Sequence, residues 1–273
     1  MKTILITGCS TGIGLATAEL LKAQGWQVWA SCRKLEDKAR LEQAGFKALL
    51  LDVNDSAQIN QAFEQIAASG GLDAVFCNAG NGQPGCVEDI PREALREIFE
   101  TNVFGVWEIM NQALKIFRQQ GHGRILVTSS ILGFAAMHFR GAYNATKYAV
   151  EGMADTLRCE LAGSNIYISL IEPGPIVSQF RANSLAKLHQ YIDVEQVHQK
   201  AFYQKQIQRL SRAKNDNPFA LPAQAVAQAC LQALNARRPK ARYQVTFPTK
   251  LFWILKRILP TRVFDFICRK SGG

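Results

Sequence analysis

Three residues near the middle of the chain have the types and the spacing of a proton-transfer site. Tyr143 precedes Lys147 by four positions, so the two side chains share one face if a helix begins at Tyr143. Because a fixed cation favours the phenolate, we expect Lys147 to lower the pKa of Tyr143. Ser130 ends a buried-strand pattern and could hydrogen-bond the same reacting oxygen. The structural alternative is a helix-rim tyrosine beside a solvated lysine.

A glycine-rich turn near the N-terminus has the context of a phosphate-binding loop. It follows a short apolar run at 3–7 and leads into a helical pattern. A helix N-terminus presents free backbone N–H groups, and glycines allow a pyrophosphate to approach them. The spacing differs from the GxGxxG pattern, and a tight turn that needs positive φ would also explain it. The candidate cofactor-binding residues are Gly8, Ser10, Thr11, Gly12, Ile13 and Gly14.

Two cations follow the second expected strand, at 27–31. A dinucleotide-binding fold usually has an acid there for the ribose 2′-hydroxyl, or an arginine for a 2′-phosphate. This chain has no acid at that place, and Arg33 and Lys34 stand there instead. The pattern indicates NADP(H) rather than NAD(H). A solvated basic loop that enters the helix expected at 35–44 is the alternative.

Strand and helix patterns alternate along the first two-thirds of the chain. Strands are expected at 3–7, 27–31, 46–51, 73–77, 125–127, 165–171 and 242–247, and helices at 55–68, 91–120, 143–161 and 222–234. This rhythm predicts one Rossmann-type domain over 1–273, with a doubly wound, seven-stranded parallel sheet and helices on both faces. Asp55 is the expected N-cap of its helix. Asn102 faces the apolar side of the 91–120 helix, where its carboxamide must find partners.

Two segments depart from that rhythm. Residues 176–222 show helical spacing and no good strand, which favours a helical substrate lid or a plain amphipathic cover. The tail at 248–273 is basic, aromatic and amphipathic. Such a tail could lie in a bilayer interface, cover the substrate pocket or form a subunit contact, including that of a homodimer.

Composition narrows the class of protein. The 273 residues are 48% hydrophobic and 20% charged, as in an ordinary globular chain. Residues 1–180 carry a net charge of −3 and residues 181–273 one of +13, which together give +10. Seven scattered cysteines suit a reducing compartment, and the four histidines lack metal-site spacing, so we expect no metal. We expect a cytoplasmic protein without a signal peptide or spanning helix, in contact at most with the inner membrane surface, and no nucleic-acid partner.

Taken together, these residues resemble the short-chain dehydrogenase/reductase family over about 3–178. The order and approximate separations match for Thr7-Gly8-x3-Gly12-Ile13-Gly14, Asp52, Asn78-Ala79-Gly80, Asn102, Ser130, Tyr143-x3-Lys147 and Pro173-Gly174. TGCSTGIG, CRK, IEPGPI and the basic tail are most similar to the NADP-dependent branch with 17β-hydroxysteroid and retinol dehydrogenases and bacterial aldehyde reductases. Ser178 stands where the family usually has threonine.

The resemblance implies a role for each catalytic residue. Tyr143 would be the general acid/base and Ser130 would polarise the carbonyl. Lys147 would lower the pKa of Tyr143 and bind the nicotinamide ribose, and Asn102 would kink its helix and hold a water in the proton relay. The implied cofactor contacts also include Asp52, Val53, Asn78, Ala79, Gly80, Pro173, Gly174, Ile176 and Ser178.

The principal hypothesis is a soluble NADPH-dependent reductase of an apolar aldehyde or ketone. One alternative is an NADP-dependent alcohol dehydrogenase of steroid or retinol type that runs oxidatively. Another, from a different class, is a noncatalytic NADP-binding regulator, against which the complete set of Asn102, Ser130, Tyr143 and Lys147 argues.

Overall fold

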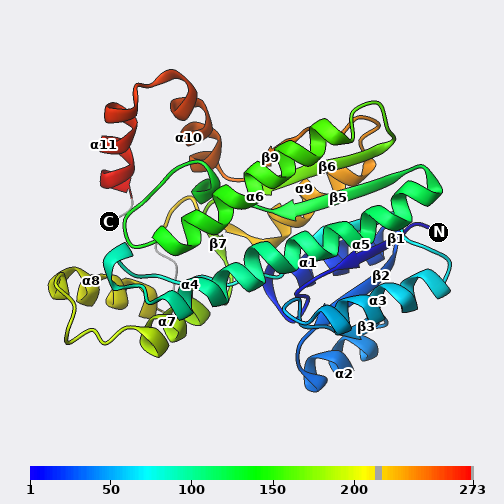
Figure 1. Ribbon diagram of the computed structural model, residues 1–273, viewed down its shortest axis with the longest axis horizontal. Helices are drawn as coiled ribbons and strands as arrows, with labels where there is room; N and C mark the ends of the chain where they lie inside the picture. Colours follow the sequence, from blue (N-terminus) through cyan, green and yellow to red (C-terminus); the bar gives the residue numbers. More distant parts are fainter. Residues whose placement is uncertain (213–216, 272–273) are drawn as a thin grey trace.

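The computed structural model describes residues 1–212 and 217–271, and its centre is a seven-stranded parallel sheet (Figure 1). The strand order is β3-β2-β1-β4-β5-β6-β9, so the chain reverses direction across the sheet next to β1. The strands are β1 (Thr3–Ile6), β2 (Gln27–Cys32), β3 (Lys47–Leu50), β4 (Ala74–Cys77), β5 (Gly123–Thr128), β6 (Ile166–Glu172) and β9 (Arg242–Gln244). The predicted doubly wound sheet is confirmed.

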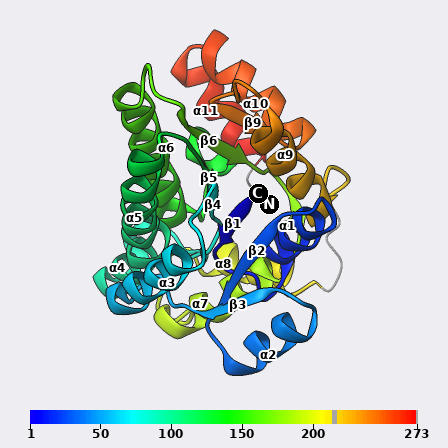
Figure 2. The same ribbon diagram turned by 90° about the vertical axis from the view of Figure 1, so that its right-hand side faces the viewer.

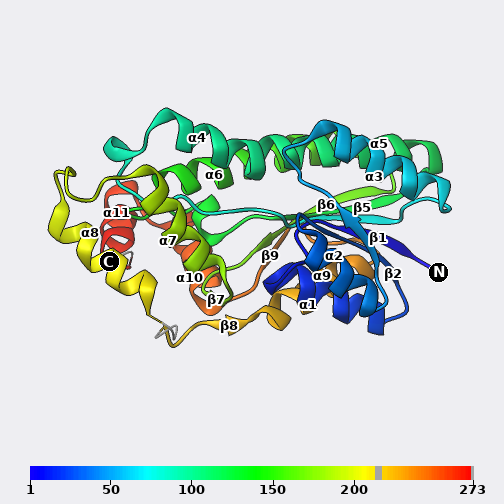
Figure 3. The same cartoon turned by 90° about the horizontal axis from the view of Figure 1, so that it is seen from below.

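Helices cover both faces of the sheet (Figures 2 and 3). One face carries α1 (Gly12–Ala23), α2 (Leu35–Gln43) and α9 (Ala223–Asn235), and the other carries α3 (Ser56–Ala68), α4 (Arg92–Phe99), α5 (Gly105–Gln120) and α6 (Gly141–Glu160). Successive strand side chains point to opposite faces. Ile4 and Ile6 therefore join the cluster under α1 and α9, while Leu5 joins the cluster under α3 and α5. This double burial explains the continuous apolar runs of the strands.

Two local expectations about helices have different outcomes. Asp55 caps α3 as predicted, since its carboxylate accepts hydrogen bonds from Ala57 N at 2.9 Å and Gln58 N at 3.1 Å. The single helix expected at 91–120 is interrupted by a π turn at Glu100–Phe104, which lies between α4 and α5. Asn102 lies in this turn, and its carboxamide faces the backbone of Asn81 in the loop after β4.

The segment at 176–222 extends from the carboxyl edge of the sheet. It contains α7 (Phe180–Tyr191) and α8 (Lys200–Ser211), as the helical spacing predicts. The expectation of no strand there is wrong at both ends, because β7 (Ile176–Val177) pairs in parallel with β8 (Leu221–Pro222). Leu221 N donates to Pro175 O at 3.1 Å, so the pair closes the base of the segment. We call 176–222 the lid segment; its residues 213–216 lie outside the described residues.

The C-terminal tail forms two helices, α10 (Phe247–Ile258) and α11 (Thr261–Ser271). The strand expected at 242–247 ends at Gln244, because Thr246 caps α10 and Pro248 lies in its first turn. Pro260 separates the two helices. Among the described residues, no helix is long and apolar enough to cross a membrane. The tail and the lid segment both lie at the end of the molecule toward which the β5 arrow points (Figure 1).

Candidate active site

The glycine turn between β1 and α1 is shaped for close approach. Gly8 and Gly12 have φ values of +73° and +61°, which favour glycine. A Cβ on Gly14 would lie 2.2 Å from Gly8 O, so any side chain there would collide with the turn. The first turn of α1 has no acidic residue, and its N-cap, Thr11, makes no side-chain hydrogen bond. The free N–H groups and the missing side chains fit the pyrophosphate of a dinucleotide.

The basic loop after β2 lies beside this turn. Arg33 and Lys34 are exposed, and within residues 1–212 and 217–271 neither forms an ion pair. Arg40 of α2 donates from Nη2 to Ser10 O at 2.5 Å and pairs with Asp37 at 2.8 Å. Arg40 thus adds a third cation near the turn. Sequence analysis missed it because a helical arginine seven residues after the loop gives no local sign of where its guanidinium points.

Asn78 joins the carboxyl ends of three strands. Its Nδ2 donates to Thr7 O at 3.0 Å and Gly8 O at 3.2 Å, and its Oδ1 accepts from Thr128 Oγ1 at 3.3 Å. Thr7 Oγ1 accepts from the backbone N–H groups of both Asn78 and Ala79 at 2.9 Å. These hydrogen bonds therefore hold the carboxyl ends of β1, β4 and β5 in fixed positions relative to one another.

The remaining cofactor candidates border the same edge. Asp52 follows β3 and accepts from Asn54 N at 3.0 Å, and Val53 is buried against Gly105, where an added Cβ would meet Val53 O at 2.5 Å. Gly80 is exposed, and its Cβ position lies 3.1 Å from Asn102 Oδ1. Close backbone contacts thus shape this part of the sheet edge.

The loop after β6 also contacts the glycine turn. Ser178 Cβ lies 3.5 Å from the position of a Cβ on Gly12, and Ile176 and Ile13 of α1 pack against the same apolar cluster. Pro173 O accepts from Ile131 N at 2.9 Å. A Cβ on Gly174 would meet two threonines of the tail, Thr246 Oγ1 at 2.1 Å and Thr249 Oγ1 at 2.6 Å.

Asn102 connects the π turn to the helix that carries Tyr143. Its Oδ1 accepts from Asn81 N at 2.9 Å, and its Nδ2 donates to Asn81 O at 2.9 Å and Thr146 Oγ1 at 3.2 Å. The Asn102 side chain is fully buried, and these hydrogen bonds satisfy its carboxamide, as burial requires. Thr146 Oγ1 also donates to Tyr143 O at 2.8 Å.

Tyr143, Lys147 and Ser130 lie together at the carboxyl end of β5. Lys147 is buried, with Nζ 2.7 Å from Thr128 O and 5.5 Å from the centroid of the Tyr143 ring. Burial lowers the pKa of Lys147 to about 8, against the attraction of Glu151. Ser130 accepts from Leu132 N at 3.1 Å and hydrogen-bonds Tyr143.

The pKa of Tyr143 differs from the expectation. Burial raises the pKa of this phenol, and the hydrogen bond with Ser130 only opposes that rise. Lys147, whose Nζ donates to Thr128 O, is not among the groups that shift the pKa of this phenol in the absence of cofactor and substrate. The phenol therefore holds its proton at neutral pH, as a general acid must.

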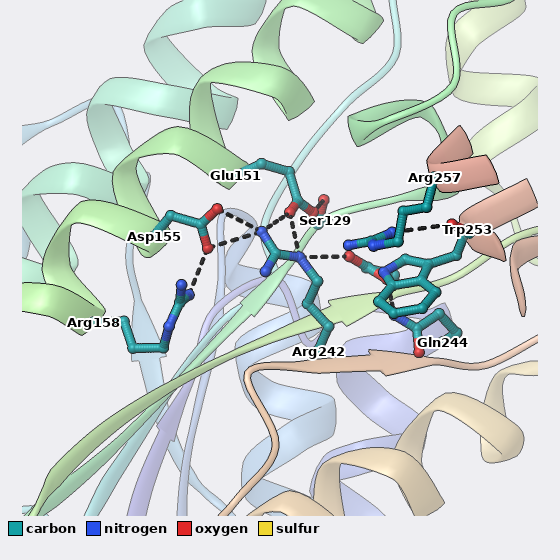
Figure 4. Close-up of polar contacts among 9 residues, drawn as sticks. Ser129, Glu151, Asp155, Arg158, Arg242, Gln244, Trp253 and Arg257 are labelled. Carbon is teal, nitrogen blue, oxygen red and sulfur yellow. Dashed lines mark hydrogen bonds and ion pairs between the residues drawn. The ribbon is translucent and has the colours of Figure 1, made fainter. Parts of the chain in front are cut away.

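A partly buried ion cluster links α6, β6 and β9 (Figure 4). Arg242 of β9 pairs with Glu151 of α6 at 2.8 Å, Asp155 of α6 at 2.7 Å and Glu172 of β6 at 3.2 Å. Ser129, next to Ser130, donates to Glu151. Burial and the nearby Glu151 raise the pKa of Glu172, while Arg242 and Gln244 oppose that rise. The cluster fixes α6, β6 and β9 relative to one another.

Sequence analysis did not identify this cluster, although two signals were present. Glu151 follows Lys147 by four positions and so shares its helix face, and Glu172 ends an apolar strand, where a carboxylate requires a partner. The partner, Arg242, is 70 positions beyond Glu172, and only the pairing of β6 with β9 brings it near.

The lid segment supplies an apolar surface beside Tyr143. The ring of Phe180, at the start of α7, lies 5.4 Å from the Tyr143 ring. Gly82 allows this approach, since a Cβ there would meet Phe180 Cζ at 2.8 Å and Ser184 Oγ at 2.5 Å. Among the described residues, no three His, Cys, Asp or Glu side chains are grouped to hold a metal ion.

The chain is similar to known oxidoreductases along nearly its whole length. The family described as short chain dehydrogenase matches residues 2–189. YbbO, an uncharacterized oxidoreductase of Escherichia coli K12, is 38% identical over 277 residues, which cover 97% of this chain and 93% of YbbO. Human 17-beta-hydroxysteroid dehydrogenase type 1 is 33% identical, with 93% of this chain and 80% of the human chain covered.

Two further proteins bear on the cofactor. The NADPH-dependent 3-dehydrocapnine reductase of Ornithobacterium rhinotracheale is 30% identical, with 99% of this chain and 97% of the reductase covered. A short chain dehydrogenase/reductase from Burkholderia phymatum, solved in complex with NAD, is 25% identical with a TM-score of 0.78, and the match covers 98% of this chain and 95% of that one.

Proposed function

This chain belongs to the short-chain dehydrogenase family, and we propose that it is an NADPH-dependent reductase of apolar aldehydes or ketones. At the level of the family it is an NAD(P)-dependent oxidoreductase that acts on CH–OH or carbonyl groups. The observation that carries the finer proposal is the meeting of Tyr143 with Ser130 and Lys147 at the sheet edge, opposite the glycine turn.

In this proposal, side chains of the protein donate the proton and position the groups that exchange it. NADPH, when bound, supplies the hydride. Tyr143 gives its hydroxyl proton to the carbonyl oxygen, and Ser130 donates a hydrogen bond that holds this oxygen toward Tyr143. Lys147 places a positive charge beside the phenolate that remains, and Asn102 holds the π turn against Thr146 so that Tyr143 keeps its position. Reprotonation of Tyr143 completes the turnover.

The preference for NADPH rests on charge at the end of β2. Arg33 and Lys34 replace the acid that would accept a ribose 2′-hydroxyl, and Arg40 adds a third cation beside Ser10. A guanidinium matches a phosphate by paired, charge-assisted hydrogen bonds. The NADPH-dependent relative, similar over 99% of this chain, supports the same preference.

The apolar substrate class rests on the lid segment. Phe180 of α7 packs against Tyr143 and is 38% exposed, while Leu188, Ile192 and Phe139 are buried in the apolar cluster that joins α7 and α8. A carbonyl carried on an apolar body would bury that body against these helices. The steroid dehydrogenase relative favours the second candidate, oxidation of a steroid-type alcohol, in which Tyr143 removes the alcohol proton.

A substrate panel tests the proposed function. Purified protein is given NADPH with medium-chain aldehydes, retinal or a 17-ketosteroid, and cofactor oxidation is followed by absorbance. We expect turnover with at least one of these apolar carbonyls and much less with a small sugar aldehyde. Failure with every apolar carbonyl, or turnover only with the sugar, would contradict the substrate class.

Neutralising Glu151 is expected to shift the pH dependence of that turnover. Glu151 raises the pKa of Lys147, so Glu151→Gln removes this attraction and lets the pKa fall below about 8. Lys147 then loses its charge at lower pH, and the alkaline limb of kcat/KM moves to lower pH. Glutamine keeps an acceptor for Ser129.

Asp155→Asn is the matched control for this variant. Asp155 also pairs with Arg242, but it is absent from the groups that act on Lys147. We expect its pH profile to match that of the wild type. An unshifted profile in Glu151→Gln, or the same shift in both variants, would show that Glu151 does not act through the Lys147 charge.

A further inference from the structure

The outer side of the C-terminal tail carries an exposed apolar stripe. On α10 the stripe consists of Phe247, Leu251, Ile254 and Ile258, whose spacings of four, three and four place them on one helix face. Their exposed fractions are 62%, 39%, 50% and 67%. Side chains of this size are rarely left in water along a whole helix face.

α11 also exposes two large apolar side chains, Val263 and Phe266, which are 46% and 54% exposed. Phe219 extends the stripe on the other side, where its ring stacks on that of Phe247 at 5.7 Å. We call these seven side chains the tail face. It spans both helices and the edge of the lid segment.

The two helices that carry most of the tail face are rich in cations. The two helices contain one acid, Asp265, and six cations: Lys250, Lys256, Arg257, Arg262, Arg269 and Lys270. In the described part of the chain none of the six forms an ion pair. Three of them lie over aromatic rings of the tail: Lys256 over Phe264, Arg257 over Trp253 and Lys270 over Phe266, at 5.1 Å, 3.4 Å and 5.8 Å from the ring centroids. Their charges remain available to an external anion.

The inner side of the tail fixes this orientation. Phe252, Phe264 and Cys268 are buried and pack with Ile131 and Ala135 of the segment that follows Ser130. The stripe cannot turn inward without exposing these residues. The tail face is therefore a permanent outer surface that adjoins the active-site loop.

We propose that the tail face docks onto a bilayer surface that contains anionic lipids. Its aliphatic and aromatic side chains would enter the boundary between headgroups and acyl chains, and its cations would bind the acidic headgroups. A second copy of the chain is a poorer occupant. A twofold contact of this face would oppose six cations to six cations with only one acid on each side.

Docking in this way brings the end of the molecule that carries the lid segment toward the bilayer. The tail and the lid segment lie at the same end of the molecule (Figures 1 and 3). An apolar substrate dissolved in the bilayer would then have a short route to the protein. The docking itself is independent of the proposed reductase activity, and it is tested without substrate.

Cosedimentation with vesicles tests the proposal on the full-length protein. The vesicles contain phosphatidylcholine alone or phosphatidylcholine with phosphatidylglycerol. We expect the wild type to sediment with the anionic vesicles at low salt and to be released by high salt. The double variant Ile254→Glu, Ile258→Glu is expected to lose binding on the order of tenfold or more, because two charges would enter the interface. Lys250→Gln with Arg262→Gln is expected to weaken binding to anionic vesicles only.

Leu50→Glu is the matched control. Leu50 is 42% exposed on β3, at the sheet edge opposite β9, so it tests an added surface charge far from the tail. We expect it to bind as the wild type does. Substitution is preferable to a chain that stops at Thr249, since removal of Phe252 and Phe264 would expose Ile131 and Ala135.

Several outcomes would overturn the proposal. One is a wild type that sediments with neither kind of vesicle. Another is equal binding by the Ile254→Glu, Ile258→Glu variant, which would place the contact elsewhere. A third is a wild-type dimer, seen by sedimentation velocity, that this variant converts to a monomer while vesicles bind neither form. That result would assign the face to a second copy of the chain.

Discussion

Replacing Tyr143 by phenylalanine is expected to lower kcat for carbonyl reduction by roughly 10²- to 10⁴-fold, the usual contribution of a positioned proton donor. The substitution removes one oxygen and keeps the ring that packs at 5.4 Å from Phe180. Lys147 and Ser130 keep their backbone partners, Thr128 O and Leu132 N. The chemistry is therefore lost while the cleft is preserved. Steady-state kinetics give kcat, and quenching of protein fluorescence by NADPH gives cofactor affinity, which we expect to persist.

Tyr148→Phe is the control for this variant. Tyr148 lies on the same helix and is 41% exposed, so the variant also loses a phenol hydroxyl but leaves Ser130 and Lys147 untouched. It should turn over like the wild type. Substantial residual turnover in Tyr143→Phe would refute the assignment of Tyr143 as general acid. Loss of NADPH binding would show instead that its hydroxyl serves the cofactor.

Much of the fold could be predicted from sequence because both faces of the sheet are buried. Strands buried on both sides have continuous apolar runs, such as 3–7 and 125–127, and the intervening helices keep a helical apolar period. The seven parallel strands and the family resemblance are both confirmed. The glycine turn and Tyr143 with Lys147 were visible for a related reason. Their spacing is local, so neighbouring residues in the chain determine it.

Features that depend on distant partners were not predicted. Arg242 finds Glu151, Asp155 and Glu172 only through strand pairing. The resemblance implied a kink at Asn102, but not that backbone groups of residue 81 would bind its carboxamide. The pKa of Tyr143 is raised, whereas the sequence predicted a decrease, because burial is a property of the packed structure. Local pattern thus identified the reacting groups, while tertiary contacts determine their charge states.

Replacing Arg33 by alanine is expected to weaken NADPH binding by roughly 10- to 100-fold, as for the loss of charge-assisted hydrogen bonds. Arg33 is exposed, and in residues 1–212 and 217–271 it forms no ion pair, although its charge acts on Glu97, so its guanidinium can meet a 2′-phosphate. NADH has a hydroxyl at that place and should lose little. Fluorescence titration with both cofactors gives the two affinities, and their ratio is the measured quantity.

Arg238→Ala is the matched control, since Arg238 is an exposed arginine that precedes β9 at the opposite end of the parallel strands. Its loss changes the net charge equally but leaves the cofactor edge unaltered. If the ratio of NADPH to NADH affinity falls in both variants, long-range charge rather than contact explains the preference. If Arg33→Ala weakens both cofactors equally, Arg33 does not touch the 2′-phosphate. Lys34 and Arg40 would then be the candidate contacts of the 2′-phosphate. Arg40 already donates a hydrogen bond to Ser10 O.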